Sequence, residues 1–244
     1  IPTAKEAVRN RDAHFPYRFD SYFYYLTGFM EPESVVVITG GASSRSILFC
    51  RAKNEEKEIW DGFRQGPESA KKLFQFDDAY PMDEIDRVLP QLIENKDTIY
   101  TPLGVNTQWD TKMMGWLNQT RSRAREGIEA PASLVDAREI LDEMRLIKDS
   151  RELETMRKAA AISAEAHVNA MTKTKPGKYE YQIEAEFLYH FKKNGSQFPA
   201  YTSIVAGGKN ACVLHYAENN SLLNKGDLLL IDAGCELNGY ASDI

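Results

Sequence analysis

The sequence is poor in cysteine. It holds 3 cysteines among 244 residues, Cys50, Cys212 and Cys235, and they lie far apart without forming a CxxC pair. An odd number of scattered cysteines disfavours both a disulfide framework and a structural zinc site. Because separated free thiols are typical of a reducing compartment, we expect a cytoplasmic protein.

Long apolar runs and an excess of basic charge are also missing. No apolar run approaches the roughly 18 residues that a membrane-spanning helix needs, so we expect no membrane partner. Acidic residues outnumber basic ones by 36 to 30, which gives a net charge of −6 and disfavours binding to nucleic acid. The chain opens with Ile1 and has no basic-then-apolar leader, so we expect that a preceding segment was removed or never included.

The composition is that of a globular protein, with 43% hydrophobic and 27% charged residues. In the first half, the β-branched and apolar runs at 34–39 and 45–50 predict two strands joined by a turn that contains glycine and serine. A third strand is predicted at 97–103. Between them, residues 82–95 have helical spacing, although a proline in the segment would disturb the helix. Alternating strands and helices indicate an α/β domain over residues 1–140.

A boundary region follows at 131–150, where proline and serine interrupt the pattern. We place the second domain at 141–244. Asp149 and Glu152 have the spacing of a capping box, which predicts a helix that begins there and runs to about residue 172. The residues expected on or near its buried face are Leu153, Met156, Ala160, Ala164, His167, Val168 and Met171.

A second helix is predicted at 179–194, ending at Gly195, which suits the residue that follows a helix. The residues expected to be buried on it are Ile183, Phe187 and Phe191. Four strand-like segments come next, at 202–207, 211–216, 227–237 and 239–244. Helices followed by strands indicate an α+β domain.

The last strands are predicted to form a hairpin. Asn238 and Gly239 both tolerate the positive φ of a type I′ turn, which is the strongest short signal for a hairpin. With these two residues as the turn, Leu237 pairs with Tyr240 and Asp243 faces Gly234. Alternation then places Asp232 and Asp243 on one face.

Two carboxylates so placed can hold one cation, or bridge two cations about 3.5 to 4 Å apart. We expect the small Gly234 to leave room for an ion opposite Asp243. Hard oxygen ligands favour Mn²⁺ or Mg²⁺. The alternative is a pair of solvated aspartates near a turn. Against this alternative, Asp232 ends the apolar run LLLI, and a buried carboxylate needs a partner.

Segments along the whole chain resemble one family. DAGCELNGYASDI is similar to the DAG…GY…DI segment of the pita-bread metallopeptidases. The further segments FPYRFDSYFYYLTGFMEPESVVV, IWDGFRQG, LDEMRLIKDSRELETMRKA, AYTSIVAGGKNACVLHY and KGDLLLIDAGCELNGY resemble bacterial Xaa-Pro aminopeptidase, also called aminopeptidase P. This resemblance implies an α/β amino-terminal domain of the creatinase N-terminal type, followed by the first part of an α+β pita-bread catalytic domain.

The resemblance also implies roles for five residues. Asp232 and Asp243 would be metal ligands for two divalent ions, most readily Mn²⁺, with Asp243 bridging them. His215 would be the catalytic histidine, hydrogen-bonded to the substrate near the scissile carbonyl or the proline. Tyr201 would line the subsite for the first residue of the peptide. Trp60 would cap the active site of a neighbouring subunit in a homo-oligomer.

The activity implied is hydrolysis of the bond between an amino-terminal residue and a proline in second position. The family needs a further histidine and two glutamates after Asp243, so we expect the chain to be a fragment that has no peptidase activity by itself. A Xaa-Pro dipeptidase (prolidase) is one alternative. A non-catalytic pita-bread relative that acts as a binding module is another, as is a metal-free creatinase-like amidinohydrolase.

Overall fold

The computed structural model describes residues 1–41 and 44–244. The chain divides into two compact units, Ile1–Leu146 and Ile147–Ile244. This division lies inside the boundary region 131–150 that the sequence indicates, while the domain limit at residue 140 stays a prediction. None of the helices in the described part of the chain has the length and apolar character needed to cross a bilayer.

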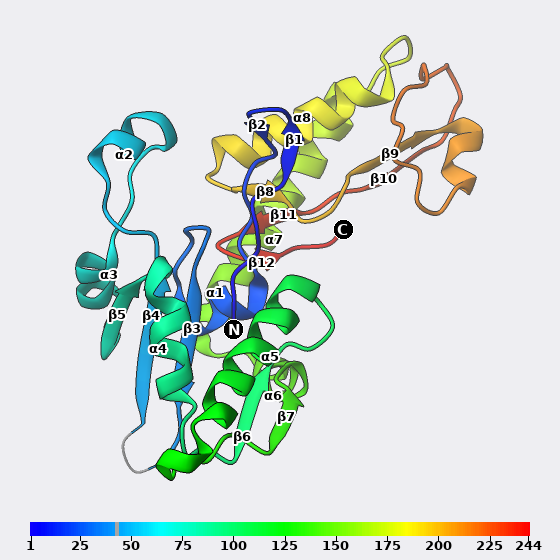
Figure 1. The fold of residues 1–244 in the computed structure, drawn as a ribbon. Coiled ribbons are helices and arrows are strands. Elements are labelled where there is room, and N and C mark those ends of the chain that lie inside the picture. The colour runs from blue at the N-terminus through cyan, green and yellow to red at the C-terminus, as the bar shows by residue number, and fades with distance from the viewer. Residues whose placement is uncertain (42–43) are drawn as a thin grey trace. The chain divides into compact units, whose positions relative to one another are not determined.

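The first unit contains a sheet of three strands, β3 (Val35–Thr39), β4 (Arg45–Cys50) and β5 (Asp78–Pro81) (Figure 1). β3 and β4 are antiparallel, and β5 runs parallel to β4. The two strands predicted at 34–39 and 45–50 are therefore confirmed. Residues 42 and 43 of the expected turn between them lie outside the described residues.

A second pair of strands in this unit is parallel: β6 (Thr98–Thr101) and β7 (Ser133–Asp136). β6 confirms the strand predicted at 97–103. The predicted helix at 82–95 is shorter, because Met82–Glu84 forms a 3-10 turn and only α4 (Ile85–Leu92), which includes the proline, is α-helical.

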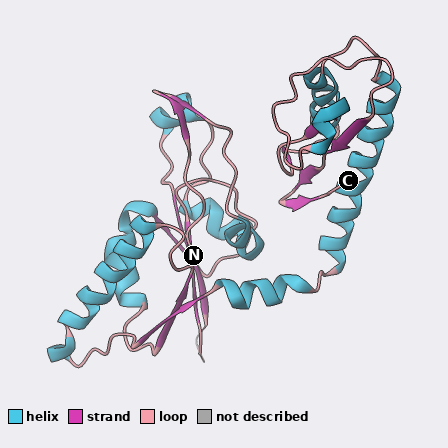
Figure 2. Ribbon diagram, turned by 90° about the vertical axis from the view of Figure 1, so that its right-hand side faces the viewer, coloured by secondary structure: helices cyan, strands magenta, loops and turns pink. Residues whose placement is uncertain are grey.

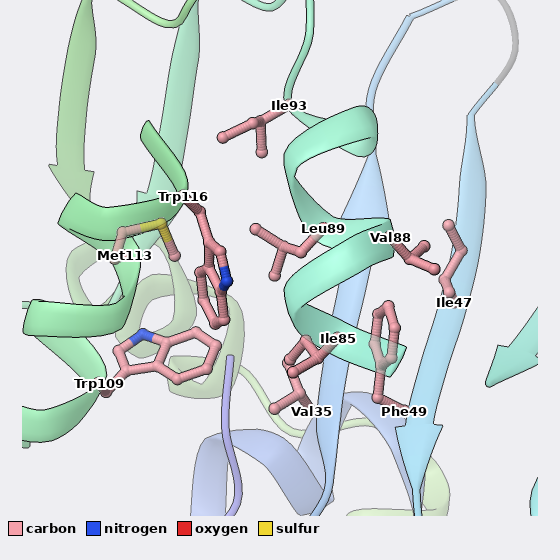
Figure 3. Packing of buried hydrophobic residues seen from close by; sticks show 10 residues of the cluster. All are labelled: Val35, Ile47, Phe49, Ile85, Val88, Leu89, Ile93, Trp109, Met113 and Trp116. Atoms are coloured by element: carbon pink, nitrogen blue, oxygen red, sulfur yellow. The ribbon is translucent and has the colours of Figure 1, made fainter. Parts of the chain in front are cut away.

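The main core of this unit lies where α4 meets α5 (Thr107–Ser122) and the first sheet. Figure 3 shows the side chains of α4 between the two tryptophans of α5 and strands β3 and β4. The rings of Trp109 and Trp116 meet edge to face with centroids 5.4 Å apart. Strands covered by helices in this way agree with the expected α/β class.

Smaller elements complete the unit. They are β1 (Val8–Asn10), β2 (Ala13–His14), α1 (Ser21–Thr27), α2 (Glu55–Asp61), α3 (Pro67–Phe74), a 3-10 turn at Ala124–Glu126, and α6 (Arg138–Leu146). Helix α2 contains no buried residue, and it lies apart from the three-stranded sheet of its unit (Figure 1).

The second unit is built on α7 (Ser150–Lys173), a long continuous helix (Figure 2). Its capping box is present as predicted, with Asp149 accepting from the Glu152 amide and Glu152 accepting from the Asp149 amide. The predicted buried face is wrong. The buried residues are small ones, Ala159, Ser163, Ala166 and Ala170, whereas Val168 is 61% and Met171 is 71% exposed.

Small side chains on α7 allow close packing against α8 (Glu180–Lys193) and the following strands. On α8 the prediction holds, since Ile183, Phe187 and Phe191 are buried. The chain leaves this helix at Gly195, whose φ of 85° lies in the left-handed region. These residues join α7 and the strands in one apolar cluster.

The strands of this unit form two small sheets. β9 (Ile204–Gly207) pairs antiparallel with β10 (Leu229–Asp232), and β11 (Cys235–Leu237) lies between β8 (Phe198–Pro199) and β12 (Tyr240–Ala241). Helices followed by strands confirm the α+β class expected for the second domain.

The strand predicted at 211–216 is wrong. Gly208–Cys212 forms a 3-10 helix, η3, and the following residues are a loop. Leu214 is 90% exposed and Val213 is 52% exposed, so the middle of this apolar run is not buried. Its two ends, Ala211 and Tyr216, pack against residues of β9. Hydrophobicity alone suggested a strand, but the end of this segment is held by a hydrogen bond from the Tyr216 hydroxyl to Glu180 of α8.

Candidate metal and peptide site

The predicted hairpin is present at the end of the second unit. Leu237 pairs with Tyr240, and the two turn residues have positive φ, 48° at Asn238 and 77° at Gly239. Positive φ at both central positions is what a type I′ turn requires. The register predicted from these two turn residues is therefore confirmed.

Pairing continues beyond the β12 ladder. The Ser242 amide donates to the Cys235 carbonyl at 2.9 Å, and the Ala233 amide donates to the Ile244 carbonyl at 3.1 Å. These two bonds place Asp243 opposite Gly234, as predicted. The expectation that Gly234 leaves room for an ion is wrong, because a Cβ there would lie 1.9 Å from the Ser242 carbonyl oxygen. The glycine makes space for the backbone of the facing strand.

The phenol of Tyr201 joins the two aspartates. Its hydroxyl donates to Asp243 Oδ1 at 2.8 Å. The pKa of Tyr201 is raised because burial disfavours the phenolate and because hydrogen bonds with Asp232 and Asp243 retain the proton. The Tyr201 hydroxyl therefore lies close to both carboxylates and donates its proton to Asp243, as expected for side chains on the same face.

Asp232 ends β10, where it pairs with Ile204. Its Oδ1 atom is buried and has no hydrogen-bond partner among the described residues. A buried carboxylate oxygen without a partner is costly, and a divalent cation would satisfy it. The two aspartates therefore fit part of a metal site. Within residues 1–41 and 44–244, no group of three or more His, Cys, Asp or Glu side chains is placed to hold a metal.

His215 and Trp60 are the other residues predicted for this site. His215 lies in the loop after η3 with its side chain exposed, and within the described residues no hydrogen bond or ion pair joins it to either aspartate. Trp60 is on α2 in the first unit and is 84% exposed. The roles of His215, Trp60 and Tyr201 in binding or catalysis stay predictions.

The sequence interpretation missed Glu180, the first residue of α8. It is fully buried, and its carboxylate accepts hydrogen bonds from the loop that carries His215. A glutamate in the first turn of a helix is expected from the helix dipole alone, so its sequence position gave no sign of burial. The only sequence feature that could have indicated buried partners for Glu180 is the group of polar residues at 210–221.

Comparison with known proteins identifies both parts of the chain. Residues 1–100 match the family model described as "Aminopeptidase P, N-terminal domain", and residues 154–244 match that of "Metallopeptidase family M24". The chain combines an aminopeptidase P amino-terminal domain with part of an M24 catalytic domain. This confirms the resemblance and the fold class that the sequence indicated.

Individual relatives agree with this assignment. The Xaa-Pro aminopeptidase of Escherichia coli is 40% identical over 246 residues, covering 100% of this chain and 56% of the relative. That of Haemophilus influenzae is 40% identical, covering 98% of this chain and 53% of the relative. The chain therefore spans about half the length of the curated relatives it matches.

Solved structures show the same fold. An aminopeptidase of Pseudomonas aeruginosa superposes with a TM-score of 0.97 at 48% identity, over 100% of this chain and 55% of that one. A zinc-substituted E. coli aminopeptidase P in complex with product also has a TM-score of 0.97, at 40% identity, over 100% of this chain and 56% of that one. The architecture around the two aspartates is thus that of aminopeptidase P.

Proposed function

We propose that this chain is part of a metal-dependent aminopeptidase that hydrolyses the bond between an amino-terminal residue and a proline in second position. The observation that carries the proposal is the pair Asp232 and Asp243, which lie close to the Tyr201 hydroxyl, while Asp232 Oδ1 is buried and has no partner among the described residues. The Xaa-Pro aminopeptidases that share the sequence and fold support it.

Asp232 and Asp243 would hold the metal as two of its ligands. We propose two divalent ions, most readily Mn²⁺ because both donors are hard carboxylate oxygens. When bound, the ions would polarise the scissile carbonyl and lower the pKa of a water nucleophile. The fit rests on the unpaired oxygen of Asp232 and on the carboxylate chemistry of the pair.

Tyr201 would keep the two carboxylates in place. Because its pKa is raised, the phenol stays protonated and donates to Asp243 Oδ1 without adding negative charge. The ring would line the subsite for the first residue of the peptide, next to the carboxylates. The free amine of the substrate would lie near one of the metals held by this pair.

His215 would contact the substrate beside this pair. Its imidazole can donate a hydrogen bond to the carbonyl before the proline, or hold a proton during bond cleavage. The exposed side chain is available for such a contact. The neighbouring Tyr216 is only 7% exposed, so the backbone at His215 is anchored on one side.

Trp60 would act between subunits. It is 84% exposed, and its neighbours Ile59 and Phe63 are 81% and 68% exposed, which leaves an apolar cluster open on the α2 segment. We propose that a second copy of the chain covers this cluster in a homo-oligomer. We also propose a cytoplasmic location, because Cys50, Cys212 and Cys235 are free thiols.

Peptide cleavage by the complete protein, the full-length polypeptide that contains these 244 residues, tests the proposal. An Arg-Pro-Pro peptide should be cleaved after arginine, a matched Arg-Ala-Pro peptide far more slowly, and a chelator should abolish both reactions. Cleavage of Xaa-Pro dipeptides only would instead identify a prolidase. Failure to cleave any of these peptides would favour a binding module or an amidinohydrolase. The 244-residue chain alone is predicted to be inactive, because it carries only two of the expected metal ligands. Peptide cleavage by this chain alone would contradict that prediction.

A further inference from the structure

Glu180 is a buried carboxylate surrounded by neutral donors. Its side chain is 0% exposed. Oε1 accepts from the Gly207 amide at 2.7 Å and from Asn210 Nδ2 at 3.1 Å, while Oε2 accepts from the Tyr216 hydroxyl at 2.7 Å and the Ser221 amide at 2.8 Å. Each carboxylate oxygen therefore has two donors.

These hydrogen bonds favour the ionised form of Glu180. Burial opposes ionisation, but the donors outweigh it and hold the pKa of the carboxyl below its usual value. The position at the start of α8 adds the favourable end of the helix dipole. A neutral amide in the same place would direct its own N–H groups at some of these donors.

The four donors all come from one segment, 207–221. Gly207 is its first residue, at the end of β9, and Ser221 is its last, while Asn210 and Tyr216 lie between. The Glu180 amide also donates to the Ser221 carbonyl at 3.0 Å. One residue of α8 therefore fixes the beginning, middle and end of this segment.

This segment carries His215, directly before Tyr216. Beyond the 3-10 helix the loop forms no strand, so no sheet ladder determines its path. A second anchor is Asn219, which accepts from the Val205 amide at 2.9 Å and donates to the Ser203 carbonyl at 2.8 Å. The loop conformation around His215 is thus set by polar side chains, with Glu180 making the largest share of the contacts.

We propose that Glu180 is a positioning residue whose ionised carboxylate holds the loop 207–221 so that His215 is presented to the peptide. The role of His215 in this statement rests on the proposed function, whereas the ordering of the loop does not. A purely structural role for Glu180 predicts a different outcome: its loss would weaken the protein regardless of which residue stands at position 215.

The test uses the complete protein with Glu180→Gln, His215→Ala and the double variant. Glu186→Gln is the matched control, because Glu186 is another carboxylate of α8 and no role is assigned to it. Glu180→Gln should lower kcat about 10- to 100-fold with a smaller change in KM, since small displacements of a catalytic group have effects of this size. In the His215→Ala background the same change should alter kcat less than about threefold.

Amide hydrogen exchange of 207–221 gives a readout independent of activity. Glu180→Gln should speed exchange in this segment about tenfold or more, while Glu186→Gln leaves it unchanged. If Glu180→Gln does not fold, Tyr216→Phe removes a single donor and should shift exchange and kcat in the same directions. The proposal would be overturned if Glu180→Gln lowered kcat equally in the wild-type and His215→Ala backgrounds. It would also be overturned if Glu180→Gln left amide exchange in 207–221 unchanged. Wild-type protein that cleaves no Xaa-Pro peptide would refute the proposed function instead, and the exchange result would still decide whether Glu180 orders the loop.

Discussion

The hydroxyl of Ser163 on α7 lies 2.7 Å from the hydroxyl of Ser242, the residue before Asp243. Both oxygens also accept from the Cys235 amide, at 3.0 and 3.1 Å. The two serines are buried, at 0% and 8% exposure. This polar contact ties the aspartate hairpin to the long helix, inside an otherwise apolar interface.

Ser163→Ala should therefore weaken the second unit. It removes a buried partner of Ser242 and of the Cys235 amide, and such a loss costs about 1–3 kcal/mol. Urea unfolding of the complete protein measures the change. Ser150→Ala, at an exposed position of the same helix, is the control and should change the free energy of unfolding by less than about 0.5 kcal/mol. Equal effects of the two substitutions would show that the serine contact adds nothing.

Gly234→Ala should be strongly destabilising. A Cβ at this position would lie 1.9 Å from the Ser242 carbonyl oxygen, so the facing strand would have to move. Overpacking of this kind costs about 1–3 kcal/mol or more. Gly115→Ala in α5 is the control, because nothing lies within 4 Å of its Cβ and alanine favours a helix. The midpoint temperature of thermal unfolding should fall for Gly234→Ala and should stay the same or rise for Gly115→Ala. If Gly234→Ala left the midpoint temperature unchanged, the backbones at Gly234 and Ser242 would have to lie further apart than in this structure.

The acid stability of the protein should depend on Glu180. Its pKa in the folded state is below the ordinary value of 4.5, so the folded state prefers the ionised form. The stabilisation is present above the unfolded pKa and is lost as pH falls through the folded pKa. The free energy of unfolding, measured with urea between about pH 6 and pH 3, should depend less on pH in Glu180→Gln than in wild type. The same pH dependence of the free energy of unfolding in both proteins would contradict an ionised, hydrogen-bonded Glu180 in the folded state.

Local signals explain which parts of the fold could be predicted. The hairpin register follows from Asn238 and Gly239, whose positive φ fixes the turn without help from distant residues. The capping box at Asp149 and Glu152 is equally local. Both were predicted correctly because the turn or cap chemistry is complete within a few residues.

Tertiary packing explains which parts of the fold could not be predicted from the sequence. The buried face of α7 is made of small residues such as Ala166, because the facing helix and strands come close, and hydrophobicity alone pointed to larger side chains. The loop at 211–216 was mistaken for a strand because its anchor, Glu180, is on another element. The contact of Tyr201 with Asp243 joins residues 42 positions apart, and no local pattern predicted it. The family resemblance implied only that Tyr201 lines the subsite for the first residue of the peptide.

The number of divalent ions bound by the complete protein tests the central claim most directly. Asp232→Asn and Asp243→Asn each remove a carboxylate charge from the pair that lies close to the Tyr201 hydroxyl. Asp227→Asn is the control, since Asp227 lies in the same unit, outside the pair. With wild-type protein loaded with Mn²⁺, metal analysis after dialysis should show clear loss of bound metal in the first two variants and none in the control. Unchanged metal content in Asp232→Asn and Asp243→Asn would contradict the account.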